Sequence, residues 1–172
     1  VGETTLTTQA FHKALEIHKT AYDYEDAVDD PAVMQKAKRQ VLKEMIERMT
    51  LLERARELGL RVEKAELDAA VREIQKGYPE GEFENVLLES AVSLESWRKA
   101  LADRLLLEKV IQRDLADAVP ISDAAVQAFI DAHSDETSPA TGGGRDQANR
   151  NIRDHLRRQK VEAMYPGWVE KL

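Results

Sequence analysis

The stretch that decides the fold is PAVMQKAKRQVLKEMIERMTLLERARELGLRVEKAELDAAVREIQK, residues 31–76. Its apolar side chains recur at steps of three and four residues, the spacing that gathers them on one face of an α-helix. Pro31 suits a first helical turn because its missing N–H is not needed there, and Gly59 suits the position just past a helix end. The stretch therefore predicts a long helix over 31–58 and another over 63–76.

Capping residues and helix breakers define the other predicted elements. Glycine and proline in GYPEGE, residues 77–82, separate the helix before them from a short one. Pro120 ends a long helix, because the residue before a proline avoids the α region. No run of residues alternates with period two, so we predict an all-α, multi-helix fold. The remaining boundaries are a first helix from Thr7 or Thr8, the long helix after Ser93, a sixth after Ser122, and a last helix over 145–172 with a kink or an end near Pro166.

Composition excludes several classes of function. The formal net charge of -7 argues against nucleic acid as the main partner. No apolar run approaches the roughly 20 residues of a membrane span. The chain has no cysteine, which excludes disulfides, thiol nucleophiles and thiolate metal sites. It begins at Val1 and not at Met, so we expect that a signal peptide, a lipoprotein anchor or another upstream segment has been removed.

Four stretches, taken in order, resemble the N-terminal domain of SurA-like periplasmic chaperones, with a related likeness to the chaperone domain of trigger factor. The order of these soft motifs is more specific than any one of them, and the likeness extends over roughly residues 1–136. The stretches are VGETTLTTQAFHKAL (1–15), VLKEMIERMTLLERARELGLRVEKAELDAAVREIQ (41–75), FENVLLESAVSLESWRKALADRLLLEKVIQRDL (83–115) and VPISDAAVQAFIDAHSDE (119–136).

The resemblance implies a domain organisation in which one part is missing. In the family, a parvulin-type prolyl isomerase domain follows the helical lobe and precedes a C-terminal helix that packs back on the lobe. Here only TSPATGGG, residues 137–144, occupies that place. We therefore predict a helical chaperone lobe over 1–133, a flexible linker over 134–144, a completing helix over 145–172, and no isomerase activity. A natural short form and an engineered deletion both fit.

Each candidate for a reactive site has a simpler structural explanation, which we prefer. His12 and Glu16 lie one helical turn apart, but no third ligand has a matching spacing, so we predict a surface pair and no metal site. His133, Ser134 and Asp135 are adjacent, whereas a catalytic triad needs side chains that converge in space. TGGGRD, residues 141–146, lacks the lysine of a nucleotide-binding P-loop. The sequence predicts neither an enzyme nor a cofactor.

The resemblance implies an ATP-independent chaperone that holds unfolded polypeptides, such as outer-membrane protein precursors in the periplasm. The alternative is a structural or adaptor module that binds one defined partner helix or its own copy. Methionine side chains adapt to irregular surfaces, although core packing explains most of them. The candidate peptide-binding residues are Met45, Met49, Leu52, Trp97, Leu101, Met164, Tyr165 and Trp168.

The glycines at 142–144 leave two assembly states open. The last helix can close on its own lobe, or it can exchange with a neighbouring copy, because the same contacts form in both arrangements. We prefer the self-closed monomer and keep the domain-swapped homodimer as the alternative.

Overall fold

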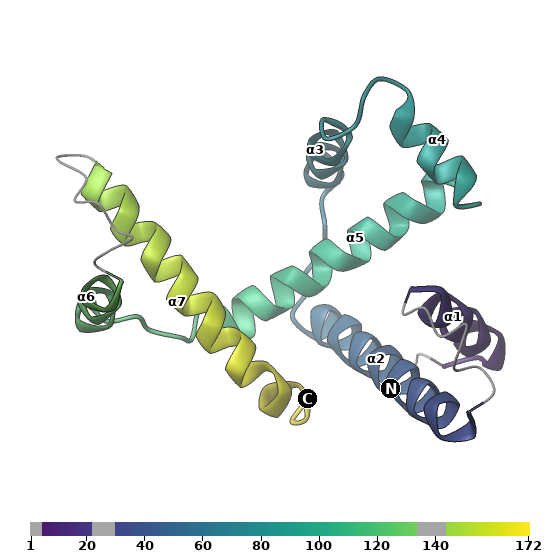
Figure 1. Cartoon of the computed structure of the whole chain (residues 1–172), viewed down its shortest axis with the longest axis horizontal. Helices are drawn as coiled ribbons and strands as arrows, with labels where there is room; N and C mark the ends of the chain where they lie inside the picture. Colours follow the sequence, from purple (N-terminus) through teal and green to yellow (C-terminus); the bar gives the residue numbers. More distant parts are fainter. Residues whose placement is uncertain (1–4, 22–29, 134–143) are drawn as a thin grey trace. The chain divides into compact units, whose positions relative to one another are not determined.

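The computed structural model describes residues 5–21, 30–133 and 144–172, and within these ranges it contains helices and no strand (Figure 1). The predicted all-α fold is therefore confirmed. The elements are α1 (Thr8–Ala21), α2 (Pro31–Glu57), α3 (Lys64–Gln75), α4 (Glu82–Glu89), α5 (Leu94–Ile111), the π turn η2 (Gln112–Ala116), α6 (Asp123–Ala132) and α7 (Gly144–Val169).

Side-chain caps start the helices at the positions that the sequence predicts. The Thr7 hydroxyl accepts a hydrogen bond from the backbone N–H of Ala10 at 3.1 Å. Asp30 caps α2 in the same way, and Pro31 occupies the first turn. Ser93 and Ser122 accept from backbone N–H groups three residues further on, at 3.1 and 3.2 Å. Each cap satisfies a donor that the first helical turn leaves without an intrahelical partner.

The chain forms two compact units, residues 1–107 and 108–172, and α5 continues across the boundary between them. The predicted linker over 134–144 lies outside the described residues except for Gly144, with which α7 begins. The predicted division into lobe, linker and completing helix stays a prediction.

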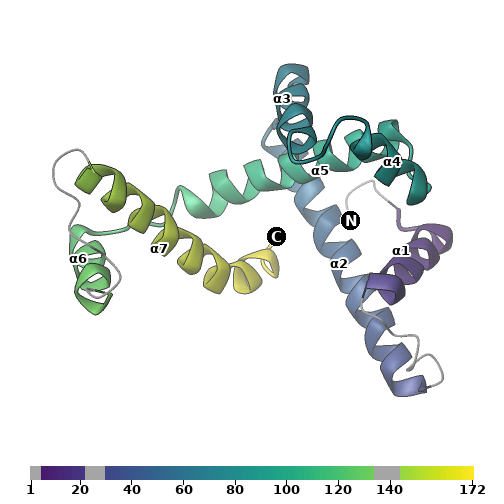
Figure 2. The same cartoon turned by 45° about the horizontal axis from the view of Figure 1, so that its top comes forward.

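The first unit is held together by one helix pair and by contacts among three further helices. Figures 1 and 2 both show α1 running beside α2, and Leu15, Ala37 and Val41 are buried between them. Arg98 of α5 pairs with Asp68 of α3. The carboxylate of Asp103 on α5 lies 2.5 Å from the guanidinium of Arg48 on α2. The buried apolar residues among α3, α4 and α5 are Val71, Phe83, Leu87 and Leu101.

In the second unit, α7 packs against η2 and α6. Val110 is fully buried, and Ile152 of α7 is buried as well. Arg153 pairs with Asp123, which connects α7 to the start of α6. The helix does not end at Pro166 but continues to Val169.

The long helix that we predict to reach Val119 instead leaves α-helical geometry after Ile111. The N–H of Asp117 donates to the carbonyl of Gln112 at 2.9 Å, a bond that spans five residues. The buried side chains Val110 and Leu115 are five residues apart, and a π turn, which adds one residue to a helical turn, lets both be buried.

Candidate functional site

The described residues contain no cluster of groups suited to metal binding. No three His, Cys, Asp or Glu side chains among them lie close enough together to hold a metal ion. His133 follows the last residue of α6, and its Nδ1 lies 2.8 Å from the carbonyl oxygen of Phe129 in that helix. Ser134 and Asp135 lie outside the described residues. In the part of the chain that the structure describes, no helix is both long enough and apolar enough to span a membrane. The features that remain to be considered are apolar surfaces.

Three candidate residues, Met45, Met49 and Leu52, lie on α2 at steps of four and three residues and are half-buried. Met45 packs against the cluster that α1 forms with α2. Leu42 and Ile46, which widen the same stripe, are exposed. A stripe too wide for one neighbouring helix to cover is the sequence signal for their exposure, and sequence reasoning did not select them.

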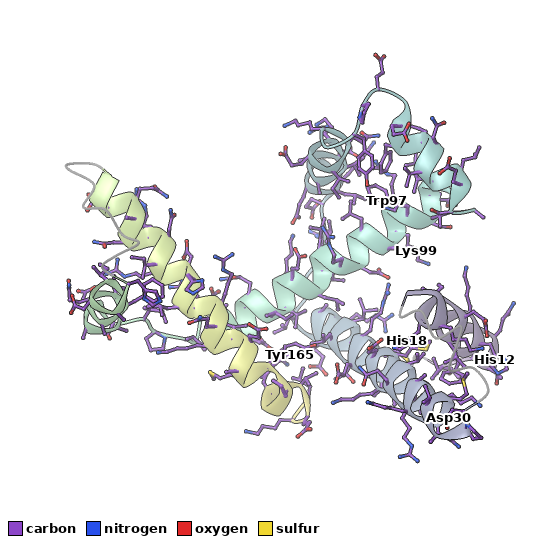
Figure 3. All side chains as sticks on the ribbon, viewed as in Figure 1. His12, His18, Asp30, Trp97, Lys99 and Tyr165 are labelled. Carbon is purple, nitrogen blue, oxygen red and sulfur yellow. The ribbon has the colours of Figure 1, made fainter. Side chains whose placement is uncertain are left out.

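Trp97 and Leu101 lie one turn apart on α5, but their surroundings differ. The Trp97 ring meets the buried Phe83 ring edge to face, with centroids 4.8 Å apart, so Trp97 lies on the side of α5 that meets α4 (Figure 3). Trp97 remains half-buried. Leu101 is only 5% exposed and packs in the core of the first unit. Of the two, Trp97 is the residue that retains accessible surface.

An ion pair next to Trp97 connects α5 to α3. The hydrogen bond from Arg98 lowers the pKa of Asp68, and the positive charges of Arg98, Lys64 and Arg72 lower it further. On α3, the hydrogen bond from Lys76 likewise lowers the pKa of Glu73. Asp68 and Glu73 are therefore ionised at neutral pH.

The other three candidates lie at the C-terminal end of α7, in the second unit. Met164 is 49% exposed, whereas Tyr165 and Trp168 are half-buried. The Tyr165 and Trp168 rings lie 5.8 Å apart at a tilt of 52°, and Figure 3 labels Tyr165 on this end of the helix. This end of α7 therefore carries two aromatic rings and a methionine that a ligand could contact.

The second unit also contains a groove of about 530 Å³ between α7 and the segment formed by the last turn of α5 and η2. Its apolar lining consists of Ile111, Ala116 and Val161, and an Asp154–Arg157 pair with an N–O distance of 3.1 Å lies on its wall. Sequence reasoning missed this groove. The remaining lining residues are Glu108, Gln112, Asn151 and Arg158.

The eight candidate residues thus belong to two units. Met45, Met49, Leu52, Trp97 and Leu101 belong to the first, and Met164, Tyr165 and Trp168 to the second. Each unit offers apolar contact surface.

Comparison with known proteins identifies the relatives of the first unit. The family model for the SurA-like N-terminal domain matches residues 1–111. A protein named Chaperone SurA from Nitrosospira multiformis is 31% identical over 110 residues, which cover 63% of this chain and 24% of that protein. A protein of the same name from Chromohalobacter salexigens is 31% identical over 105 residues, covering 60% of this chain and 24% of that protein. The chain thus spans about a quarter of the length of these relatives. No solved structure matches it.

Proposed function

Because the chain belongs to the family of SurA-like N-terminal domains, we propose that it is an ATP-independent chaperone that holds unfolded polypeptide. The observation that carries this proposal is the family match over residues 1–111, which spans the whole first unit. The name of both relatives supports it. So do the exposed side chains of Leu42 and Ile46 beside the half-buried Met49, because adjacent apolar side chains are what an unfolded client can contact.

Holding would act by mass action. Each client segment that binds lowers the concentration of free unfolded chain, and aggregation slows because it depends on that concentration. The net charge of -7 keeps the loaded complex soluble by repulsion between complexes. Met45, Met49, Leu52, Trp97, Met164, Tyr165 and Trp168 are the residues that we propose to contact the client, and the buried Leu101 would support Trp97.

We further propose the periplasm as the location and outer-membrane protein precursors among the clients, by analogy with the family. We do not expect this sequence to catalyse prolyl isomerisation, since only residues 137–144 occupy the place of an isomerase domain. Catalysed cis–trans exchange of a proline peptide at low protein concentration would contradict that expectation.

The experiment is an aggregation assay with three unrelated denatured proteins, one of them an outer-membrane β-barrel protein. Each is diluted from denaturant into buffer with increasing amounts of the chain, and light scattering is recorded. We expect slower aggregation of all three at molar excess, and a weaker effect of the double variant Leu42→Ser, Ile46→Ser. Unchanged aggregation of all three would refute a holding function. Protection of one protein alone would favour the adaptor module.

A further inference from the structure

The α4–α5 turn, residues 88–94, includes the last two residues of α4 and the first of α5, and it exposes several aliphatic side chains. The Leu88 side chain is 82% exposed, and Val92 and Leu94 are exposed as well. Leu88 follows Val86 and Leu87 on an eight-residue helix, and Leu87 is the buried member of the three. Isolated exposed leucines are common, but three exposed aliphatic side chains in one turn form a surface that needs an explanation.

The backbone of the same turn is in an unfavourable conformation. Ala91 has a φ of +50°, and among the described residues it is the one non-glycine residue with positive φ. An L-residue in this region is crowded by its own Cβ, which is why glycine usually takes the position after a helix end. Residues held in such conformations cluster at functional sites. Here Ala91 lies between Leu88 and Val92, so the strained residue belongs to the segment that exposes them.

One of the charges around the turn is also placed against local stability. Glu89 lies in the last turn of α4, where the helix dipole disfavours a carboxylate, and no basic residue shares that turn. Glu84 lies one helical turn before Leu88, and Glu95 adjoins Leu94. These two lie in the first turns of α4 and α5, where the helix dipole favours a carboxylate, and Glu84 also accepts a hydrogen bond from Gln75 at 3.4 Å. All three glutamates are exposed, and none of them forms an ion pair among the described residues.

The acidity extends beyond these three residues. From 77 to 97 the sequence has five glutamates and no lysine or arginine, so this segment carries a formal charge of -5. Arg98, which follows it, pairs with Asp68. Lys99 lies one turn beyond Glu95 without pairing with it, and Figure 3 labels it on α5. By contrast, on α2 Glu47, Glu53 and Glu57 each pair with a lysine or arginine of the same helix.

We propose that the α4–α5 turn binds a cationic, apolar segment of an unfolded polypeptide. Aliphatic side chains of the segment contact Leu88, Val92 and Leu94, while its lysines or arginines lie near Glu84, Glu89 and Glu95. Three local departures from stability coincide in this turn, as is expected of sites under functional constraint. The negative charge disfavours anionic membranes and acidic segments. This inference names the client chemistry of the proposed chaperone and rests on that function.

The test uses the full chain and two fluorescein-labelled, unstructured peptides of leucine, serine and lysine, identical except that glutamate replaces every lysine in the second. Fluorescence anisotropy gives the dissociation constants at low and high salt. We expect the lysine peptide to bind more tightly than the glutamate peptide, and the difference to shrink at high salt as screening increases. Equal affinity for both peptides at low salt would overturn the proposal.

Two variants and their matched controls locate the site. Leu88→Ser should weaken binding of the lysine peptide about tenfold, the scale of burying one leucine side chain. Ile17→Ser, at a side chain 61% exposed on α1, should leave it unchanged. The double reversal Glu89→Lys, Glu95→Lys should weaken binding about fivefold. The control Glu162→Lys, Glu170→Lys changes the net charge equally on exposed α7-side positions and should have a smaller effect.

Several results would overturn the assignment. One is equal affinity of Leu88→Ser and wild type for the lysine peptide. Another is an equal loss in the α7-side charge variant, which would mean that net charge alone attracts the peptide. A wild-type dimer that Leu88→Ser converts to monomer, with peptide affinity unchanged, would assign the turn to a second copy. If the chain still slows aggregation in these cases, the chaperone function stands and only the assignment fails. If it slows no aggregation, the proposed function fails, and the peptide affinities alone decide the role of the turn.

Discussion

Replacing Ala91 by glycine should stabilise the protein, because α2 and α4 end in the same backbone motif with different residues in the left-handed position. At the end of α2, Gly59 has a φ of +63° and the N–H of Leu60 donates to the carbonyl of Ala55 at 2.9 Å. At the end of α4, the N–H of Val92 donates to the carbonyl of Leu87, also at 2.9 Å, and Ala91 takes the left-handed position. Both ends form the Schellman motif, in which glycine is preferred.

The expected magnitude follows from two opposing effects. An L-residue in the left-handed region costs about 1–2 kcal/mol, which Ala91→Gly removes. Glycine also gives the unfolded chain more freedom, which costs about 0.4–1 kcal/mol. We therefore expect Ala91→Gly to raise the free energy of unfolding by about 0.5–1 kcal/mol. Gly59→Ala should lower it by a similar amount, since a Cβ at Gly59 meets no atom within 4 Å and only the backbone conformation opposes it.

Urea unfolding followed by far-ultraviolet circular dichroism would measure both variants. The midpoint should rise for Ala91→Gly and fall for Gly59→Ala, with slopes that match wild type. If Gly59→Ala lowers the midpoint but Ala91→Gly leaves it unchanged or lowers it, the backbone at Ala91 is not strained. That result would also remove the strain from the argument for a binding role of the turn.

Three further predictions concern charge, the last helix and assembly. Asp68→Asn should lower the free energy of unfolding at neutral pH. The difference in unfolding free energy from wild type should disappear as the pH falls below the ordinary aspartate pKa and then through the lower pKa of the folded state. The reason is that the ion pair stabilises the fold only while the Asp68 carboxyl is ionised. Urea midpoints measured across this pH range would check it. Ending the chain before Ser134 removes α7 and should destabilise the second unit by about 3–6 kcal/mol. This is the scale of losing the buried side chains of Ile152 and Val169 at ~1.5–3 kcal/mol each. An unchanged melting temperature would contradict the prediction. Light scattering should give a monomer mass over a wide concentration range. A dimer that appears or becomes more populated when the glycines at 142–144 are deleted would instead indicate exchange of the last helix, because a shorter hinge strains closure on the same lobe.

Helix boundaries could be predicted from the sequence because the interactions that set them are local. A capping hydroxyl, as at Ser93 and Ser122, bonds to an N–H three residues away. Pro31 and Gly59 act through their own backbone preferences. None of these effects depends on which helix lies alongside, and the structure confirms each of them.

Exposure of apolar residues could not be predicted in the same way, since it depends on partners distant in sequence. Leu88 and Leu101 are the same residue type on helices with apolar stripes, yet one is 82% exposed and the other 5%. Only the packing of α3, α4 and α5 separates them. The candidate contact residues were therefore selected by type and spacing, and the buried Leu101 was included while the exposed Leu42 and Leu88 were omitted.

The groove of the second unit is intermediate between the predictable helix boundaries and the unpredictable exposure, because part of its cause is local in the sequence. The two buried side chains Val110 and Leu115 are five residues apart, whereas the half-buried Ile111 lies four residues before Leu115. In a regular helix Leu115 would share a face with Ile111, and Val110 would share one with Asp114. The π turn avoids this at the expense of regular hydrogen bonding, and its first and last residues, Gln112 and Ala116, both line the groove. A one-residue offset in an apolar stripe can thus mark a widened backbone and the cavity beside it, so such offsets should be scored when functional surfaces are predicted from sequence.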